Sequence, residues 1–339
     1  MTVEENVSLA SLTTFKIGGP ARYFCRVQSL PDLKEAVAFG KKNRLPFLIL
    51  GGGSNILLPD NGFPGLVVKI DILGLEFKEE MKILEVVAGA GEIWDDLVAL
   101  SVQKDLWGME NLSGIPGTVG GAPVQNIGAY GMELAKLVEW VEVYDSKTGK
   151  VRQLSVRECK FGYRDSLFKK PEGKHLIVVR VAFSLSKTAR PELSYKDLKE
   201  FFKKKNKDPN LAEIRSAVLS IRSKKFPDLT RVGTAGSFFK NPVVSQSVYE
   251  KLQSEHPDLP GFPTGKGHVK LSLAWIIDHI CKFKNLRVGD AIVSEKQALV
   301  ICNDGHARAE DVTALAKSIF HAVKNATGIE IEPEVRLFF

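Results

Sequence analysis

The residues best suited to chemistry in this 339-residue chain lie in one short stretch, residues 233–242, which reads GTAGSFFKNP. Its small residues would let the backbone approach a ligand closely, and Ser237 offers a hydroxyl group. Lys240 and Asn241 follow with hydrogen-bond donors, and Pro242 ends the stretch. A plain turn can carry glycines, but two aromatic residues, a cation and an amide directly after them favour a functional site. We therefore predict that this stretch binds a ligand or reacts with it.

A glycine-rich turn, GGGSN at residues 51–55, follows the continuous apolar run at 46–50. Backbone N–H groups can converge on a phosphate where such a turn ends a buried strand. The spacing fits neither a P-loop nor a dinucleotide-binding fingerprint. On its own this segment therefore fits a phosphate-binding turn and a plain tight turn equally well.

A second glycine-rich segment, LSGIPGTVGGAPVQNIGAYG at residues 112–131, cannot form a regular element, because six glycines and two prolines interrupt it. Long ordered loops of this kind are usually functional. The uncharged turns suit close contact with a large flat cofactor and its pyrophosphate, while Gln125, Asn126 and Tyr130 supply directed hydrogen bonds.

An arginine between an aromatic residue and a carboxylate stands in FGYRDS at residues 161–166. Arg164 could form an ion pair with its neighbour Asp165, or direct its forked guanidinium group at a carboxylate ligand. The motif alone favours the ion pair.

The elements that must position these residues mix strands and helices in both halves, so we predict an α+β protein. Hydrophobic periodicity predicts strands at 21–27, 46–50, 65–70, 83–89, 138–145, 150–154 and 175–185, and a closing strand at 329–339. Helices are predicted at 31–43, 92–105, 211–224, 245–256, 272–281 and 311–327. The composition changes after residues 186–191, which predicts a boundary between a domain at 1–186 and a domain at 187–339.

Composition and charge exclude several classes of protein. The net charge of +7 fits either nucleic acid or anionic small ligands. The basic run at 199–207 lacks any nucleic-acid-binding pattern, so we expect a solvated helix end or loop there. The N-terminal residues do not form a secretory signal, and no apolar run reaches the length of a membrane span, so we expect a cytoplasmic protein.

Cysteine and histidine spacing gives no sign of a metal site. The four cysteines lie far apart without a C-x-x-C pair, and the six histidines form neither H-x-H nor H-E-x-x-H. We therefore expect reduced, mostly buried cysteines and no bound metal.

Five segments taken together resemble the UDP-N-acetylenolpyruvoylglucosamine reductase family. They read GGGSN at 51–55, IPGTVGGAPVQNIGAYG at 115–131, FGYRDS at 161–166, GSFFKNP at 236–242 and EPEVR at 332–336. The resemblance spans most of the chain in the right order. It implies an NADPH-dependent flavoenzyme that reduces the enolpyruvyl ether of UDP-N-acetylglucosamine enolpyruvate to the lactyl ether, giving UDP-N-acetylmuramate for peptidoglycan, and so serves cell-wall synthesis, cell shape and cell division.

The resemblance also implies which residues carry the reaction. Ser237 would be the proton donor, Arg164 would stabilise the developing enolate, and Glu334 would orient a group or reprotonate there. Unaided serine is a poor acid, so we hypothesise that Lys225 or Arg164 lowers the pKa of Ser237. The same alternation that places Glu334 on one face of a closing strand also fits a solvated polar face.

Non-covalent FAD is implied, in a two-subdomain fold of the vanillyl-alcohol-oxidase-like (PCMH) type within residues 1–186. The glycine segments contain no histidine or cysteine to which flavin could attach. The implied FAD-binding residues are Gly51, Gly52, Gly53, Ser54, Asn55, Pro116, Gly117, Val119, Gly120, Gly121, Gln125, Asn126, Gly128, Ala129, Tyr130 and Gly131.

The C-terminal domain, 187–339, is implied to bind the UDP-sugar, and its last strand could return to the flavin site. The implied substrate-binding residues are Tyr195, Lys225, Asn241, Gln297 and Arg336. Tyr195 resembles the family branch that closes a tyrosine-bearing loop over the substrate. Thr234 stands where the family often has serine or asparagine, a mild departure from its pattern. We expect a monomer that binds no nucleic acid and no membrane.

Two rival functions remain open. An FAD oxidase of the same flavin fold would use oxygen, but it would not need GSFFKNP or EPEVR. A nucleotide-sugar-binding or anion-binding protein without flavin would not need Ser237, Arg164 and Glu334 together.

Overall fold

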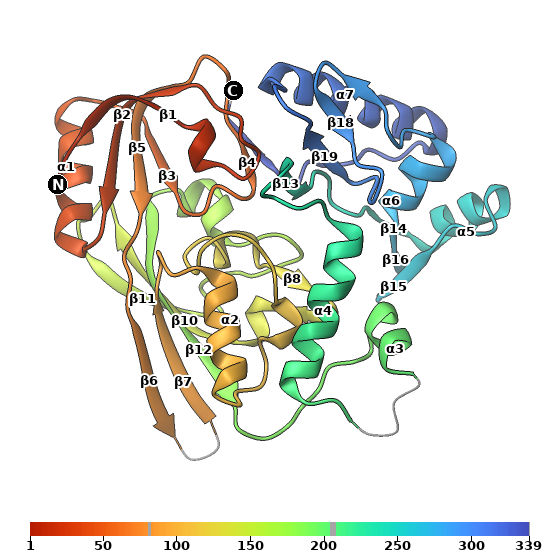
Figure 1. The fold of residues 1–339 in the computed structure, drawn as a ribbon, viewed down its shortest axis with the longest axis horizontal. Helices are drawn as coiled ribbons and strands as arrows, with labels where there is room; N and C mark the ends of the chain where they lie inside the picture. The colour runs from red at the N-terminus through yellow and green to blue at the C-terminus, as the bar shows by residue number, and fades with distance from the viewer. Residues whose placement is uncertain (81–82, 204–207, 339) are drawn as a thin grey trace. The chain divides into compact units, whose positions relative to one another are not determined.

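A computed structural model describes residues 1–80, 83–203 and 208–338. The chain divides into two compact units (Figure 1). The first unit comprises Met1–Val7, Ala21–Gly52 and Pro64–Ser223, and the second comprises Ser8–Pro20, Gly53–Phe63 and Lys224–Phe339.

The predicted domain boundary at residue 186/187 differs from this division of packing. Residues 187–223 belong to the first unit, and two short N-terminal segments belong to the second. Periodicity along the chain cannot reveal which unit such segments join, because this depends on contacts between residues distant in sequence. That residues 187–339 act as the substrate domain stays a prediction.

The first unit contains two main sheets, besides a two-stranded one. The first sheet has the order β1-β2-β5-β3, from β1 (Glu4–Ser8), β2 (Pro20–Val27), β5 (Phe63–Ile70) and β3 (Phe47–Leu50). β3 and β5 are parallel. Helix α1 (Leu30–Lys42) precedes β3, and it begins where Ser29 accepts a hydrogen bond from the Asp32 N–H group.

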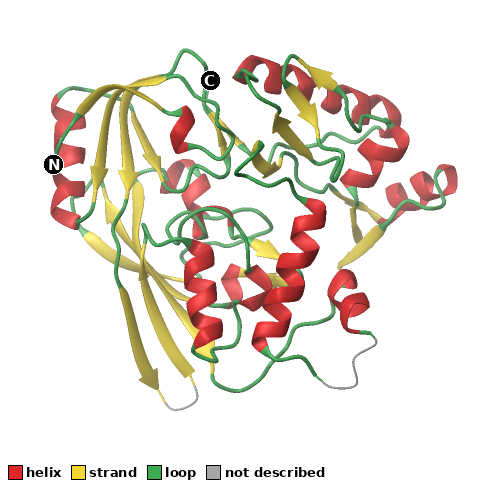
Figure 2. Ribbon diagram, in the orientation of Figure 1, coloured by secondary structure: helices red, strands yellow, loops and turns green. Residues whose placement is uncertain are grey.

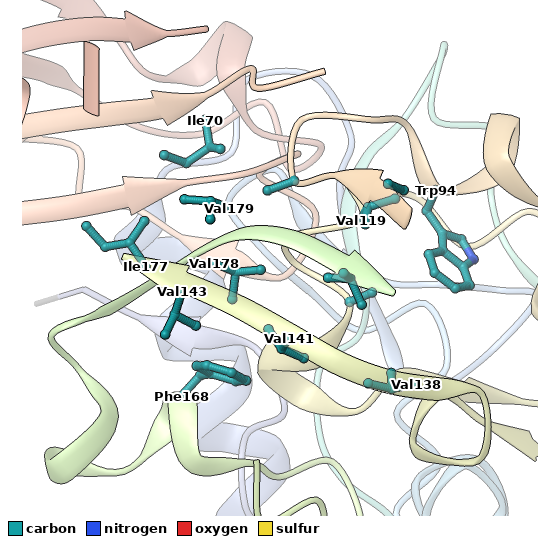
Figure 3. Close-up of a cluster of buried hydrophobic side chains, with 14 of the residues drawn as sticks. Ile70, Trp94, Val119, Val138, Val141, Val143, Phe168, Ile177, Val178 and Val179 are labelled. Atoms are coloured by element: carbon teal, nitrogen blue, oxygen red, sulfur yellow. The ribbon is translucent and has the colours of Figure 1, made fainter. Parts of the chain in front are cut away.

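The second sheet of this unit is antiparallel, in the order β11-β10-β12-β7-β6. Its strands are β11 (Val151–Ser155), β10 (Val138–Asp145), β12 (Leu176–Ser186), β7 (Ile83–Gly89) and β6 (Leu75–Glu80). Most of β12 is buried. Figure 3 shows valines of β10 and β12 in the core cluster, together with Trp94 and with Val119 from the glycine-rich segment.

Two helices of the first unit frame the glycine-rich segment, α2 (Trp94–Gln103) and α4 (Leu211–Lys225), and the short α3 (Lys196–Phe202) precedes α4. The segment itself forms only short 3₁₀ turns and the two-residue strand β8 (Gly128–Ala129), which pairs with β9 (Met132–Glu133). The predicted absence of long regular elements at 112–131 is confirmed. The basic run at 199–207 ends α3 as predicted, although residues 204–207 lie outside the described residues.

The second unit also contains two main sheets (Figure 2). One has the order β13-β19-β18-β17, from β13 (Gly233–Ser237), β19 (Val300–Asn303), β18 (Ala291–Val293) and β17 (Arg287–Val288). The other has the order β14-β16-β15, from β14 (Val243–Ser245), β16 (His268–Leu271) and β15 (Gly261–Gly265). The helices are α5 (Gln246–Glu255), α6 (Leu273–Trp275), which continues as a π-helix at Ile276–Ile280, and α7 (Ala309–Thr327).

The long closing strand predicted at 329–339 is wrong. Only β20 (Arg336–Leu337) enters a ladder, where it pairs in parallel with β4 (Ile56–Leu57). Pro333 has no N–H group to donate and makes only an isolated bridge with Phe239. Ile329, Ile331 and Val335 are buried as predicted, but Leu337 is exposed. Phe339 lies outside the described residues.

Three further features of the described residues concern membrane-spanning helices, metal-ligand clusters and the state of the cysteines. None of the helices within residues 1–80, 83–203 and 208–338 combines the length and hydropathy of a membrane span. The same residues contain no cluster of His, Cys, Asp and Glu that could hold a metal ion. All four cysteines are free thiols; Cys25, Cys159 and Cys302 are buried, and Cys281 is half-buried.

Candidate active site

A β-bulge orients Ser237 in the second unit. The pairing of β13 with β19 shifts register between Thr234 and Ser237, and Gly236 adopts a φ of 77°. Thr234 stabilises the bulge, because its hydroxyl donates to the Ile301 carbonyl over 2.7 Å and accepts from the Gly236 N–H group over 3.2 Å. Bulges commonly redirect side chains next to active sites. The half-buried Ser237 hydroxyl therefore stands on a rigidly held turn.

The backbone around Glu334 is held from two sides within the same unit. Its N–H group donates to the Phe238 carbonyl over 2.8 Å, and its carbonyl accepts from the Asn55 side-chain amide over 3.1 Å. The Arg336 N–H group also donates to the Asn55 carbonyl over 3.0 Å. The structure therefore brings together three of the sequence motifs, GGGSN, GSFFKNP and EPEVR.

The donors that follow Ser237 are engaged by neighbouring segments. Lys240 forms an ion pair with Glu332 at 3.0 Å. The Asn241 side-chain oxygen accepts from the Leu273 N–H group over 3.0 Å at the start of α6. Phe238, next to Ser237, is buried. These contacts fix the GSFFKNP motif against two other segments of the second unit.

The two glycine-rich segments meet in the first unit. A Cβ atom at Gly52 would lie 2.5 Å from the Gly117 Cα atom, and one at Gly120 would lie 2.6 Å from the Ala90 Cβ atom. Side chains at these glycines would therefore collide with backbone or core. The Gly120 N–H group donates to the Ala90 carbonyl over 2.9 Å. The two turns therefore form a close-packed wall.

Thr118 carries an unsatisfied polar atom in this wall. Its hydroxyl is buried and has no hydrogen-bond partner within the described residues. A Cβ atom at Gly51 would lie 2.7 Å from that hydroxyl oxygen. A buried hydroxyl without a partner is costly, which favours a ligand group that completes it. The two glycine turns and this hydroxyl therefore fit a cofactor whose pyrophosphate lies against backbone.

Arg164 is joined to the second glycine segment. Its guanidinium group donates to the Gly128 carbonyl over 2.8 Å. Its sequence neighbour Asp165 instead pairs with Lys170 at 2.6 Å. Asn126, at a φ of 45°, donates to the Gly162 carbonyl over 3.0 Å. The FGYRDS motif and the glycine segment are therefore one connected structure.

Tyr130, Arg222 and Tyr195 form a second group in the first unit. The rings of Tyr130 and Tyr195 meet edge to face, with centroids 5.3 Å apart. Burial raises the pKa of Tyr130 to about 12, while its hydrogen bond with Arg222 acts in the opposite direction. Desolvation lowers the pKa of Arg222, and the nearby charge of Arg164 adds to this effect. Two guanidinium groups therefore lie close enough to repel each other, an arrangement that an anion would stabilise.

The predicted site residues are thus divided between the units. Gly51, Gly52, Arg164, Tyr195 and the residues at 116–131 belong to the first unit, and Gly53, Ser54, Asn55, Lys225, Ser237, Asn241, Gln297, Glu334 and Arg336 belong to the second. Tyr195 is 41% exposed. Gln297 lies between β18 and β19, where its carbonyl accepts from the Val300 N–H group over 2.9 Å.

Comparison with known proteins decides the family. An FAD-binding domain matches residues 21–155, and the C-terminal domain of UDP-N-acetylenolpyruvoylglucosamine reductase matches residues 228–338. The reductase of Chromobacterium violaceum is 42% identical over 97% of both chains. The chain belongs to the UDP-N-acetylenolpyruvoylglucosamine reductase family.

Other relatives agree along the whole length. The UDP-N-acetylenolpyruvoylglucosamine reductase of Bdellovibrio bacteriovorus is 39% identical over 98% of this chain and 99% of its own. The crystal structure of the reductase from Thermus caldophilus matches with a TM-score of 0.70 and 29% identity, covering 100% of both chains. The family predicted from the five motifs and the α+β fold class, with its FAD-binding region, are confirmed.

Membership of the reductase family settles the activity and the cofactors. The chain is an oxidoreductase that uses FAD and NADPH to reduce enolpyruvyl-UDP-N-acetylglucosamine to UDP-N-acetylmuramate in peptidoglycan synthesis. The rival functions, an oxygen-dependent oxidase and a binding protein without flavin, are therefore set aside.

The sequence interpretation missed two residues that the structure adds to the site. Thr118 lies inside the second glycine segment but was not among the predicted cofactor-binding residues. Arg222 lies on α4, whose basic residues gave no separate signal. Arg222 follows Arg215 by seven residues, so both lie on one face of the helix. That spacing is the sequence signal that could have identified Arg222.

Proposed function

We propose that Ser237, Arg164 and Glu334 carry the proton and charge movements of this NADPH-dependent, FAD-containing reductase. Bound FAD would supply the hydride for the enolpyruvyl double bond, and NADPH would be the source of that hydride. A proton must then be added at the other carbon, and negative charge spreads onto the substrate carboxylate before that. The residues of this chain have to supply the proton and stabilise the charge.

Ser237 is the proposed proton donor. The bulge at Gly236 and the hydrogen bonds of Thr234 hold its position. A fixed hydroxyl loses little entropy when it transfers a proton, which favours general acid catalysis. The source of its acidity stays a hypothesis, with Lys225 or Arg164 as the activating cation.

Arg164 and Glu334 are the proposed partners of this serine. Arg164 is anchored to the Gly128 carbonyl, and a positioned guanidinium group suits stabilisation of a developing enolate. Asn55 and Phe238 hold the backbone of Glu334, and we assign to its carboxyl group the role of orienting or reprotonating at the reacting carbon.

The glycine turns are the proposed flavin-binding wall. A Cβ atom at Gly51, Gly52 or Gly120 would lie within 2.7 Å of a neighbouring atom, and Thr118 has a buried hydroxyl to offer. Asn126 is one of the predicted FAD-binding residues, but its side chain is hydrogen-bonded to Glu133, Gly162 and Ala135. We therefore propose that Asn126 stabilises the conformation of the second glycine-rich segment. FAD is held without a covalent bond.

Tyr195, Lys225, Asn241, Gln297 and Arg336 are the proposed contacts of the UDP-sugar. The exposed ring of Tyr195 packs on Tyr130 and precedes α3, which suits a loop that closes over a ligand. The positively charged Lys225 and Arg336 suit binding of the diphosphate. The side-chain amides of Asn241 and Gln297 can form directed hydrogen bonds. We also propose a cytoplasmic monomer that binds no nucleic acid.

The decisive experiment separates the two half-reactions without oxygen. NADPH should bleach the flavin spectrum of the wild-type protein, and UDP-N-acetylglucosamine enolpyruvate should restore it. In Ser237→Ala, bleaching should stay within about two-fold of wild type, and restoration should slow by about 10²- to 10⁴-fold. Restoration at the wild-type rate would show that Ser237 is not the donor, and recovery only in air would point to an oxidase.

A further inference from the structure

An ion pair joins α2 to α4 in the first unit, between residues 120 positions apart. Arg215 donates to Asp95 through both terminal nitrogens, over 2.6 and 2.9 Å. The two side chains are 17% and 31% exposed. A bidentate contact of this kind restricts geometry more strongly than a single contact does. It therefore fixes the position of α4 relative to the start of α2.

The same carboxylate also holds the glycine-rich segment. The Gly114 N–H group donates to Asp95 over 2.6 Å. Gly114 has a φ of 70°, and a Cβ atom there would lie 2.8 Å from the Leu219 side chain and 3.1 Å from the Arg222 Nε atom. Asp95 therefore holds Gly114 at the place where α4 packs against the glycine-rich segment.

Arg222 extends this arrangement to the candidate site. It follows Arg215 by seven residues, about two helical turns at roughly 3.6 residues per turn, so both lie on one face of α4. Its guanidinium group is hydrogen-bonded to Tyr130 and lies near Arg164. A rotation or shift of α4 would move this guanidinium group directly.

We propose that Asp95 and Arg215 are positioning residues of the reductase, which hold Arg222 beside Tyr130 and Arg164 by fixing α4 against the glycine-rich segment. The inference rests on the proposed catalytic role of Arg164. An ion pair that is still partly exposed contributes only modestly to stability, so the main contribution of this pair is geometric. Displacements on the order of 1 Å near reacting groups slow enzymes markedly.

The test uses Asp95→Asn, Arg215→Met and the double variant in the anaerobic half-reactions. In Asp95→Asn the new side-chain carbonyl would still accept from the Gly114 N–H group, while the charge that binds Arg215 is lost. Each single variant should slow reoxidation by the enolpyruvyl substrate about 10-fold, and flavin reduction by NADPH should stay within about two-fold. The double variant should be no slower than the slower single variant. Arg215→Lys should recover part of the rate.

The chain offers a matched control in the same unit. Arg180 and Glu142 form another bidentate pair, at 2.9 and 3.0 Å, on the sheet that contains β10 and β12. Glu142→Gln should leave both half-reactions at the wild-type rates. If Asp95→Asn behaves like Glu142→Gln in both half-reactions, the pair of Asp95 and Arg215 is only structural and the inference is wrong. Failure of the wild-type protein to be reoxidised would instead overturn the proposed function, and this inference with it.

Discussion

The side-chain amide of Asn55 donates to the main-chain carbonyl of Glu334 over 3.1 Å, across 279 positions of sequence. Just beyond these two residues the segments pair as parallel strands, Ile56 with Arg336 and Leu57 with Leu337. The residue that ends a predicted cofactor-binding turn thus holds a proposed catalytic residue. Asn55 therefore has a function in the second unit whether or not it also contacts flavin.

Asn55→Ala should slow reoxidation by the enolpyruvyl substrate about 10-fold, because the Glu334 backbone loses one of its two anchors. Stopped-flow absorbance of the flavin measures this rate directly. Asn303→Ala is the control, since it removes three hydrogen bonds to Phe15, Gly305 and Ala307 in the same unit. The control should lose about 2–3 kcal/mol of unfolding free energy and keep the reoxidation rate. Equal rates in Asn55→Ala and wild type would contradict the anchoring role.

Thr118→Val tests the flavin-binding wall. The Thr118 hydroxyl has no hydrogen-bond partner within the described residues, so replacing it with a methyl group should leave the melting temperature of the flavin-free protein unchanged or slightly raised. FAD affinity should fall about 5- to 10-fold, the loss of roughly one hydrogen bond. Flavin fluorescence titration and thermal unfolding measure the two quantities. A stability loss without an affinity loss would show that the hydroxyl serves the fold alone.

Much of the fold could be predicted from the sequence because local patterns determine it. The alternation at 138–145 predicted β10 with its observed ends, Val138–Asp145, and the apolar stripe at 311–327 predicted nearly all of α7. Gly328 stops that helix in the left-handed conformation, with a φ of 72°. The closing strand was wrong because Pro333 and distant partners, rather than alternation, decide its pairing.

The candidate site could be predicted only in part. Motifs identified Ser237, Arg164 and Glu334, since each stands in a distinctive short sequence. The hydrogen bond of Asn55 to Glu334 and the approach of Arg222 to Tyr130 depend on tertiary packing, which no local spacing encodes. The roles of all these residues stay predictions until the variants are measured.

The Asp95 carboxyl should make the stability difference between wild type and Asp95→Asn depend on pH. Burial alone would raise the pKa of Asp95, but hydrogen bonds from Arg215 and Gly114 outweigh it and hold the pKa below 3.8. A carboxyl with a lowered folded-state pKa stabilises the fold above its unfolded pKa and loses that effect as the pH falls through the folded pKa. Urea unfolding should therefore show the largest difference near neutral pH, shrinking below 3.8. A difference that is constant with pH would exclude the ionised carboxylate as its source.

Thiol reactivity should separate Cys281 from the other cysteines. Burial raises the pKa of Cys25 and Cys302 to about 11 and that of Cys159 to about 12. Since the thiolate is the nucleophile, these buried groups should not react with an aromatic disulfide reagent at about pH 8 while the chain is folded. Cys281 is half-buried, and although burial raises its pKa too, its sulfur is the one that a reagent can reach.

Absorbance of the released thiolate should therefore show at most one equivalent reacting before denaturation and all four in guanidinium chloride. Cys281→Ser should abolish the first equivalent and leave three. Two or more equivalents reacting in the folded wild-type chain would mean that a buried cysteine opens to solvent, because a thiol enclosed by core side chains can react only after local unfolding.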